Sequence, residues 1–356
     1  TYQSSEVGEE AIKKSGRSFD LMIADEAHNT TSAGLTAFTR PLYDEHIPSK
    51  RRIFLTATPR IVSKRTRRRA EEEGYDIHSM DDTAVYGEVA HKLPFSEAIR
   101  KNLLTDYEIF VVGVDDSDIA DAIRERAFLK IDSSEINGEE LAAHIAIHRA
   151  MKKRGTRRMI TFHSRIKQAQ TFSKNVPLVK EWLRKNRRLH APKVWGDTVS
   201  GEMPVVQRER VLARFDALDD GECGIVSNAR CLGEGVDVPT IDGISFVQPK
   251  RSPIDIVQAV GRAIRKSKKK EGTSTIILPV PILGTADPTD TIASSAFETV
   301  WRVLEALRAH DDVLKESLDE LRTRLGERRG GEIRLPKLFL DLPRSVNAAF
   351  NDAIRL

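Results

Sequence analysis

A short apolar run that ends in a cluster of acids constrains the fold of this chain most strongly. Residues 21–24 read Leu-Met-Ile-Ala and are followed by Asp25, Glu26 and His28. Such a run is typical of a strand buried on both faces of a parallel sheet. Ligands bind beyond the carboxyl ends of strands in open parallel sheets, so acids at that position are placed for chemistry. For an isolated Asp-Glu pair, a strand that ends in a solvated acidic turn would be the better interpretation.

The order of apolar runs predicts an α/β fold. We expect strands at residues 52–55, 109–114, 158–162, 194–195, 224–227, 243–247 and 275–280. We expect helices at residues 1–18, 33–42, 64–73, 95–104, 119–154, 168–183 with an interruption near Pro177, 205–215 and 254–265. Strands that alternate with helices in this way favour parallel sheets, here two α/β units in tandem. The expected domains are residues 1–115, 116–287 and a helical extension at 288–356, whose apolar residues recur at helical spacing.

Composition restricts the function classes. The chain has 356 residues, two cysteines and a net charge of +4, with basic clusters at 64–69, 152–158, 184–188 and 265–270. Local basic patches bind phosphate backbones, although each run by itself is more often a solvated face. Two cysteines without a C-x-x-C pair indicate a reducing compartment. We expect no membrane span and a cytoplasmic location, because the chain has no apolar run of about 18 residues.

Five short motifs follow one another in a fixed order. Asp25-Glu26-Ala27-His28 ends the first strand and Thr56-Ala57-Thr58-Pro59 ends the second. The later motifs are Phe162–Arg165, Asn228–Pro239 and Gln258–Arg265. Over roughly residues 1–285, their sequences and order resemble motifs II to VI of superfamily 2 helicases. The Asp-Glu-Ala-His box most resembles the group that includes restriction-enzyme motor subunits.

This resemblance implies two RecA-like domains, the first incomplete here, with ATP and Mg²⁺ held in the cleft between them. Asp25 would hold the metal, Glu26 would orient the attacking water, and His28 would contribute to the nucleotide site. Thr56 and Thr58 would couple the phosphate state to movement, although strand ends capped by threonine are common without such a role.

The same resemblance assigns residues of the second domain to the nucleotide. Arg262 and Arg265, expected on one helical face, would reach the phosphates, and Gln258 would line the cleft. The alternative for the arginines is a basic helix end favoured by the helix dipole. In the Gly-rich motif, the resemblance implies that Gly233, Gly235 and Asp237 contact the nucleotide; a Gly-rich turn before a strand is the alternative.

The resemblance also implies nucleic-acid contacts at His163, Ser164, Arg165 and Arg230, against the alternative of a hydrophilic loop. It favours DNA over RNA and allows nuclease or modification subunits as partners. The chain lacks the Gly-x-x-x-x-Gly-Lys-Thr phosphate loop expected upstream of Asp25. We therefore expect that it begins inside the first RecA-like domain and hydrolyses ATP negligibly by itself. The alternatives are an RNA helicase and a non-catalytic nucleic-acid-binding protein.

Overall fold

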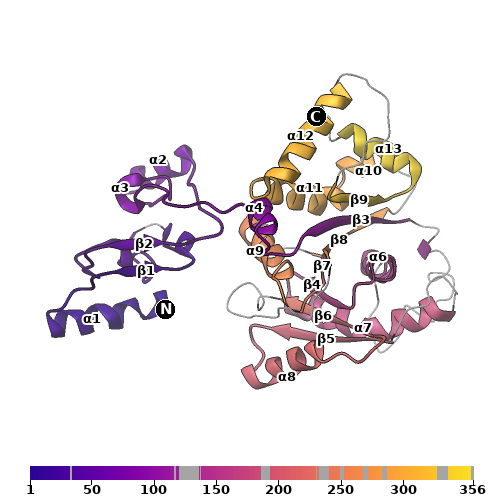
Figure 1. Cartoon of the computed structure of the whole chain (residues 1–356), viewed down its shortest axis with the longest axis horizontal. Helices are drawn as coiled ribbons and strands as arrows, with labels where there is room; N and C mark the ends of the chain where they lie inside the picture. Colours follow the sequence, from indigo (N-terminus) through magenta and orange to yellow (C-terminus); the bar gives the residue numbers. More distant parts are fainter. Residues whose placement is uncertain are drawn as a thin grey trace. The chain divides into compact units, whose positions relative to one another are not determined.

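The chain forms two compact units in a computed structural model, residues 1–92 and 93–356 (Figure 1). The structure describes residues 1–32, 34–115, 118–119, 136, 138–185, 193–229, 231, 240–248, 252–267, 272–282, 287–326 and 336–353. Each unit is described by itself, as the first and the second unit. None of the helices in these residues is long and apolar enough to span a bilayer.

The first unit is built around two short parallel strands. Its elements are η1 (Tyr2–Ser4), α1 (Ser5–Ser15), β1 (Met22–Ala24), η2 (Ala27–Thr30), η3 (Arg40–Leu42), β2 (Arg52–Phe54), α2 (Lys64–Glu72) and α3 (Thr83–Tyr86). β1 pairs with β2 from Met22 opposite Arg52 to Ala24 opposite Phe54. The strand, the acidic turn and the basic helix therefore form where the sequence predicts them.

The prediction of a helix over residues 33–42 is wrong. Most of this segment consists of turns, and only the three-residue η3 is helical. The hydroxyl of Thr39 accepts a hydrogen bond from the backbone N–H of Thr36 at 2.8 Å and donates to the carbonyl of Gly34 at 2.9 Å. Threonine side chains that bond to nearby backbone in this way compete with helical hydrogen bonds.

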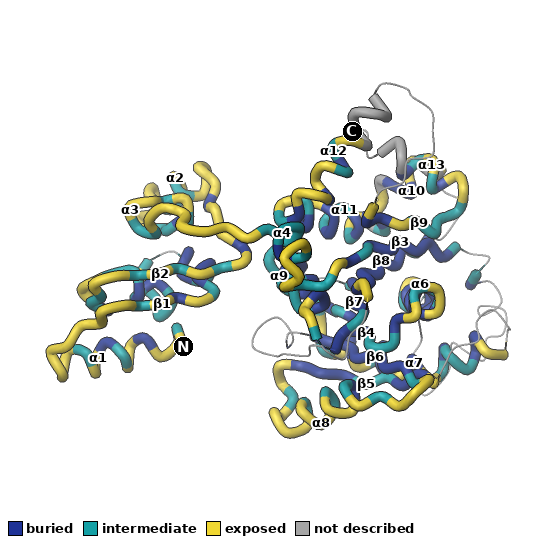
Figure 2. Tube along the Cα trace, in the orientation of Figure 1, coloured by how far each residue is buried: buried dark blue, intermediate teal, exposed yellow. Residues whose placement is uncertain are grey.

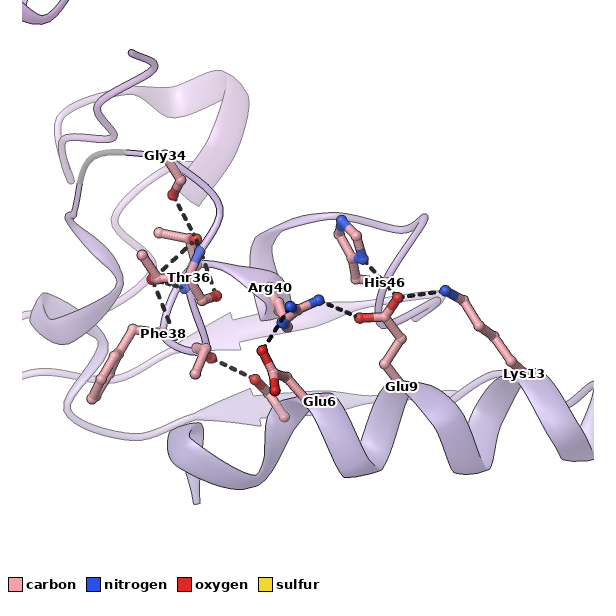
Figure 3. A network of polar contacts seen from close by, with 11 residues as sticks. Glu6, Glu9, Lys13, Gly34, Thr36, Phe38, Arg40 and His46 are labelled. Carbon is pink, nitrogen blue, oxygen red and sulfur yellow. Dashed lines mark hydrogen bonds and ion pairs between the residues drawn. The ribbon is translucent and has the colours of Figure 1, made fainter.

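A buried acid attaches α1 to the rest of the first unit (Figure 3). The carboxylate of Glu9 accepts hydrogen bonds from Lys13 at 2.6 Å and Arg40 at 2.7 Å, and lies 2.9 Å from Nδ1 of His46. Arg40 also donates to Glu6 at 2.8 Å. The hydrogen bonds from Lys13 and His46, together with that from Arg40, lower the pKa of Glu9 to about 2. Glu9 is therefore a charged anchor for the helix that precedes β1.

β1 is not buried on both faces, contrary to expectation. Ile23 in β1 is 58% exposed and Ile53 in β2 is 45% exposed. Their neighbours Leu21 and Leu55 are also exposed. Because side chains alternate along a strand, these residues form one continuous apolar face. The sheet of the first unit has no described element over that face.

The second unit is a seven-stranded parallel sheet with helices on both faces. The strands are β3 (Tyr107–Asp115), β4 (Arg158–Phe162), β5 (Lys193–Ser200), β6 (Glu222–Ala229), β7 (Gly243–Phe246), β8 (Ser274–Ile282) and β9 (Leu338–Asp341), in the order β5-β6-β4-β7-β8-β3-β9. The helices are α4 (Phe95–Arg100), α6 (Gly138–Arg154), α7 (Ile166–Lys185), α8 (Val205–Asp216), α9 (Pro253–Ala263), α10 (Pro288–Ala293), α11 (Ser295–Arg308), α12 (Asp312–Gly326) and α13 (Arg344–Ala353). The predicted parallel α/β fold is confirmed.

The domain boundary expected at residue 115 lies too late. The unit boundary falls after Lys92. β3 pairs with β8 over all nine of its residues, from Tyr107 opposite Ser274 to Asp115 opposite Ile282. Beyond Pro288, β9 pairs with the other edge of β3, so the C-terminal segment belongs to the same unit. The sequence alone did not indicate that β3, which precedes the other strands of the second unit, would pair with them.

Two hydrophobic cores cover the two faces of this sheet. Figure 2 colours its central strands largely as buried. Along β3, Ile109 and Val111 belong to the core formed with α9 and α11, whereas Phe110 and Val112 belong to the core formed with α6 and α7. All four are buried. This alternation is the pattern of a strand covered on both sides.

Two further predictions about the second unit are wrong. α7 continues through Pro177 instead of breaking, and β5 extends to Ser200 instead of ending at Trp195. Pro177 has no N–H to donate to the carbonyl of Ser173. Gly196 of β5 lies against that carbonyl, where a Cβ would come within 2.5 Å of the oxygen. The strand therefore packs closely on the helix one turn before the proline.

Candidate functional site

The acidic turn at the end of β1 has a backbone conformation that favours a functional interpretation. Asp25 is exposed directly after the strand. Glu26 has φ 48° and ψ 46°, the left-handed region. A non-glycine residue there costs of order 1–3 kcal/mol and is concentrated at functional sites. The N–H of Glu26 donates to Oδ1 of Asp25 at 2.9 Å, which helps to hold the two acids in place.

His28 joins the ends of the two strands. It is buried, and its Nδ1 lies 3.1 Å from Oγ1 of Thr56 and 3.3 Å from Oε2 of Glu26. Thr56 in turn accepts a hydrogen bond from the N–H of Thr58 at 3.1 Å. The structure therefore brings together four of the predicted residues, Glu26, His28, Thr56 and Thr58. This contact links the acid turn to the residues predicted to couple phosphate state to movement.

Sequence reasoning missed Tyr2, which lies against the acidic turn. Its hydroxyl donates to the backbone carbonyl of Asp25 at 2.6 Å, and its ring stacks on Phe38. Burial, with the charges of Asp25 and Glu26, raises the pKa of Tyr2 to about 12. The hydroxyl therefore remains a donor at neutral pH. No local sequence signal marked it, because the contact spans 23 positions along the chain.

In the second unit, α9 carries two of the predicted nucleotide residues. Gln258 and Arg262 lie four positions apart, on one face of the helix. Among the described residues, no hydrogen-bond partner exists for the buried Nε2 of Gln258. Arg265, however, lies beyond the end of α9 at Ala263, in an isolated bridge with Leu104. The expectation that Arg262 and Arg265 share one helical face is therefore wrong.

The segment that opens the second unit packs against the end of α9. The N–H and hydroxyl of Thr105 both donate to the carbonyl of Ile264, at 2.8 and 3.0 Å. A Cβ added at Gly261 would lie 3.9 Å from the ring of Phe95. These contacts fix the backbone around the arginine motif. They were not predicted, because residues 95–105 had been assigned to the other domain.

The predicted nucleic-acid residues after β4 differ in accessibility. His163 is 4% exposed, and its Nε2 lies 2.9 Å from Oγ1 of Thr161. Burial lowers the pKa of His163 to about 3, so the ring is neutral at physiological pH. A buried neutral ring is not placed to contact a phosphate. The hydroxyl of Ser164 donates to Gln168 at 2.9 Å, and Arg165 is exposed.

Four predicted residues, Arg230, Gly233, Gly235 and Asp237, lie outside the described residues. In the described part of the chain, no cluster of three His, Cys, Asp or Glu side chains could hold a metal by itself. One exposed carboxylate such as Asp25 nevertheless fits Mg²⁺, which is usually held by one or two carboxylates with water and substrate phosphates.

Comparison with known proteins relates this chain to helicases. Residues 141–267 match the family described as the helicase conserved C-terminal domain. A probable helicase of African swine fever virus (isolate Pig/Kenya/KEN-50/1950) is 26% identical over 306 residues, which cover 84% of this chain and 30% of the viral protein.

Two solved structures are similar over the whole chain. The ATP-dependent type ISP restriction-modification enzyme LlaBIII, bound to DNA, is 30% identical with a TM-score of 0.80, and the match covers 24% of that chain. A nuclease-deletion mutant of the type ISP enzyme LlaGI, in complex with a DNA substrate mimic, is 26% identical with a TM-score of 0.60, over 21% of that chain. This chain thus spans between a fifth and a third of the length of these relatives.

Proposed function

This chain belongs to the superfamily 2 helicases, and from that premise we propose that it is part of an ATP-driven motor that moves along DNA. The observation that carries the proposal is the acidic turn, with Glu26 in a left-handed conformation and His28 joined to Thr56. A solvated turn would require neither the backbone strain nor the buried histidine.

The acids of the first unit are proposed to act on ATP. Bound Mg²⁺ would neutralise charge on the triphosphate. Asp25 holds the metal through its exposed carboxylate, and Glu26 accepts a proton from the attacking water or orients it. His28 fixes Glu26 and passes the state of the site to Thr56 and Thr58.

The second unit is proposed to supply positive charge to the same triphosphate. Arg262 and Arg265 act on the phosphates, and such an arginine contributes about 10³–10⁵ in rate. Gln258, whose buried Nε2 lacks a described partner, binds at the nucleotide. Gly233, Gly235 and Asp237 are proposed to contact the nucleotide on the basis of the motif resemblance alone.

We propose that the motor binds and moves along nucleic acid. The exposed Arg165 and the partly buried Ser164 follow β4. Arg230 is proposed to contact nucleic acid on the basis of the motif resemblance alone. DNA is favoured over RNA because both type ISP relatives are described with DNA. Their description as restriction-modification enzymes supports nuclease or modification partners for this chain.

The test is DNA-stimulated ATP hydrolysis by the natural full-length protein, compared with the 356 residues alone. We expect Glu26→Gln to lower kcat at least about 10²-fold, as loss of a general base does, with the KM for ATP little changed. Glu10→Gln, on the exposed side of α1, is the control and should leave kcat unchanged. The 356 residues contain no phosphate loop and are expected to hydrolyse ATP negligibly.

The same assay separates the alternatives. Stimulation by RNA but not DNA would replace the proposal with an RNA helicase. Nucleic-acid binding without hydrolysis by the full-length protein would indicate a non-catalytic binding protein. Equal kcat for Glu26→Gln and the wild type would refute the role of the acidic turn.

A further inference from the structure

The helix α2 concentrates positive charge on the surface of the first unit. Its sequence is Lys-Arg-Thr-Arg-Arg-Arg-Ala-Glu-Glu, and none of its residues is buried (Figure 2). Lys64, Arg65, Arg68 and Arg69 are exposed, as is Arg60 shortly before the helix. α2 therefore adds little to a hydrophobic core, and its composition has to be explained by something other than packing.

The order of charges along α2 is unfavourable for the helix itself. Acids stabilise the first turn of a helix and cations the last turn, by about 0.3–1 kcal/mol each. α2 has no acid in its first turn, where Lys64 and Arg65 lie, and Glu71 and Glu72 close it. Intrinsic helix stability therefore does not account for the cations. An external anion would offset their unfavourable position.

Arg67 holds α2 in place while its basic neighbours face solvent. Nε of Arg67 donates to the carbonyl of Val62 at 3.0 Å, and Nη2 donates to Oγ of Ser79 at 3.0 Å and Oδ2 of Asp81 at 2.6 Å. Oγ of Ser63 caps the helix by accepting from the N–H of Thr66 at 3.2 Å. The basic face is thus preorganised, which lowers the ordering cost of binding a partner.

We propose that α2 binds the phosphate backbone of double-stranded DNA through Lys64, Arg65, Arg68 and Arg69. Residues four apart on a helix lie about 5–6 Å from each other, so Lys64 with Arg68 and Arg65 with Arg69 can contact successive phosphates. Arg68 has an acidic partner, Glu72 at 2.9 Å, but both side chains are largely exposed. An exposed pair of this kind is weak and gives way to a phosphate readily.

Duplex DNA fits this face better than a single strand does. Proteins that hold single strands combine basic grooves with aromatic side chains on which bases stack. α2 has no aromatic residue, and the exposed Tyr75 follows its acidic end. A surface of cations alone matches a phosphate backbone whose bases are paired. This inference rests on the proposed function, because it adds a DNA contact outside the helicase motifs.

The test measures binding of a short labelled DNA duplex by fluorescence anisotropy at several salt concentrations. In the test variant, Lys64, Arg65, Arg68 and Arg69 are all changed to Gln. Loss of four phosphate contacts should lower the slope of log affinity against log salt by about three to four. At low salt we expect binding to weaken at least about tenfold.

Two variants control for net charge and for folding. Changing Lys14, Arg17, Lys50 and Arg51 to Gln removes four exposed charges from the same unit and should leave the slope within about one of the wild type. A variant with Arg65, Arg68 and Arg69 all changed to Lys keeps the charge and should bind like the wild type. Circular dichroism melts of all three variants exclude unfolding as the cause.

The outcomes are separable. If the wild-type chain binds the duplex but the α2 variant and the charge-matched control behave alike, the inference is overturned and the proposed function stands. If the wild type binds neither DNA nor RNA, the proposed function fails. A loss confined to single-stranded DNA or RNA would overturn the assignment of the duplex.

Discussion

The two sheets of this chain show that apolar strands are buried only where helices pack over them. In the second unit, β3 is apolar on both faces and buried on both, between two cores. In the first unit, Ile23 and Ile53 are equally apolar but exposed. At roughly 25 cal/mol per Å² of buried apolar surface, only the covered sheet gains its full hydrophobic stabilisation. Two strands alone are marginal, whereas seven with helices form an independent core.

The largest expected difference is in the rate at which the two sheets open. We expect amide hydrogens of β4 and β6 to exchange at least about 10³-fold more slowly than those of β1 and β2, a difference of about 4 kcal/mol in opening free energy. Native-state hydrogen exchange of the whole chain, read by mass spectrometry, measures this. Equal protection from hydrogen exchange in both sheets would contradict the proposed difference in their stability.

Removal of Asp311 should cause a large loss of stability in the second unit. The carboxylate of Asp311 is fully buried, accepts from the hydroxyl of Tyr107 at 2.7 Å and lies 3.0 Å from Nζ of Lys337. Asp311→Ala removes the acceptor of Tyr107 and one of the two acidic partners of Lys337, whose Nζ also lies 2.9 Å from Oδ1 of Asp106. Each buried donor left without an acceptor should cost about 1–3 kcal/mol. Asp312→Ala removes an exposed neighbour and should cost under about 1 kcal/mol. Urea unfolding followed by Trp fluorescence measures both.

Acid should destabilise the two units in different pH windows. Burial lowers the pKa of His148 and His163 from 6.5 to about 3, and lowers that of His144. At a pH between these two pKa values, the unfolded state binds more protons than the folded state does. The free energy of unfolding of the second unit therefore falls as pH decreases from 6.5, by about 1.4 kcal/mol per pH unit for each histidine. Glu9 in the first unit has a pKa lowered from 4.5 to about 2, so its contribution is lost only as pH falls below 4.5.

The variant that sharpens this difference is His148→Leu. It should reduce the pH dependence of unfolding in the second unit by about 1.4 kcal/mol per pH unit. Chemical unfolding between pH 6.5 and 4.5, the ordinary pKa values of His and Glu, provides the slope. A slope unchanged by the substitution would show that this ring is already protonated in the folded state.

The smallest expected effects have opposite signs in the two units. At Gly196 a Cβ would meet the carbonyl of Ser173 at 2.5 Å, so Gly196→Ala should destabilise the second unit by about 1–3 kcal/mol. At Gly8 nothing lies within 4 Å, and the residue is inside α1. Gly8→Ala should therefore stabilise the first unit by about 0.5–1 kcal/mol. Thermal melts of the two single variants test the pair.

Residues close in sequence were predicted well and residues far apart were not. The strand at 158–162 and the helix at 64–72 have clear local patterns and form where expected. The assignment of β3 failed because pairing with β8 joins residues more than 160 positions apart. The prediction of a helix over residues 33–42 failed because the backbone N–H of Thr36 donates to the hydroxyl of Thr39 instead of forming a helical hydrogen bond.

The candidate site shows the same limit. The acids and Thr56 were found from the ends of strands, and the structure joins them through His28. Tyr2 and the contact of Thr105 with Ile264 were missed, since neither Tyr2 nor Thr105 belongs to a motif. The motif resemblance predicts that His163 contacts nucleic acid, but the burial of its ring beside the hydroxyl of Thr161 depends on packing that no local pattern reports.

The pairing of β9 with β3 has a consequence for synthesis on the ribosome. β3 is translated among the earliest parts of its unit, yet its partner strand, Leu338–Asp341, emerges more than 220 residues later. Until then one edge of β3 exposes unpaired backbone groups, the kind of edge that recruits foreign strands. A ribosome that stalls before residue 338 releases a nascent chain prone to aggregate, so completion of this unit is tied to a segment translated long after β3.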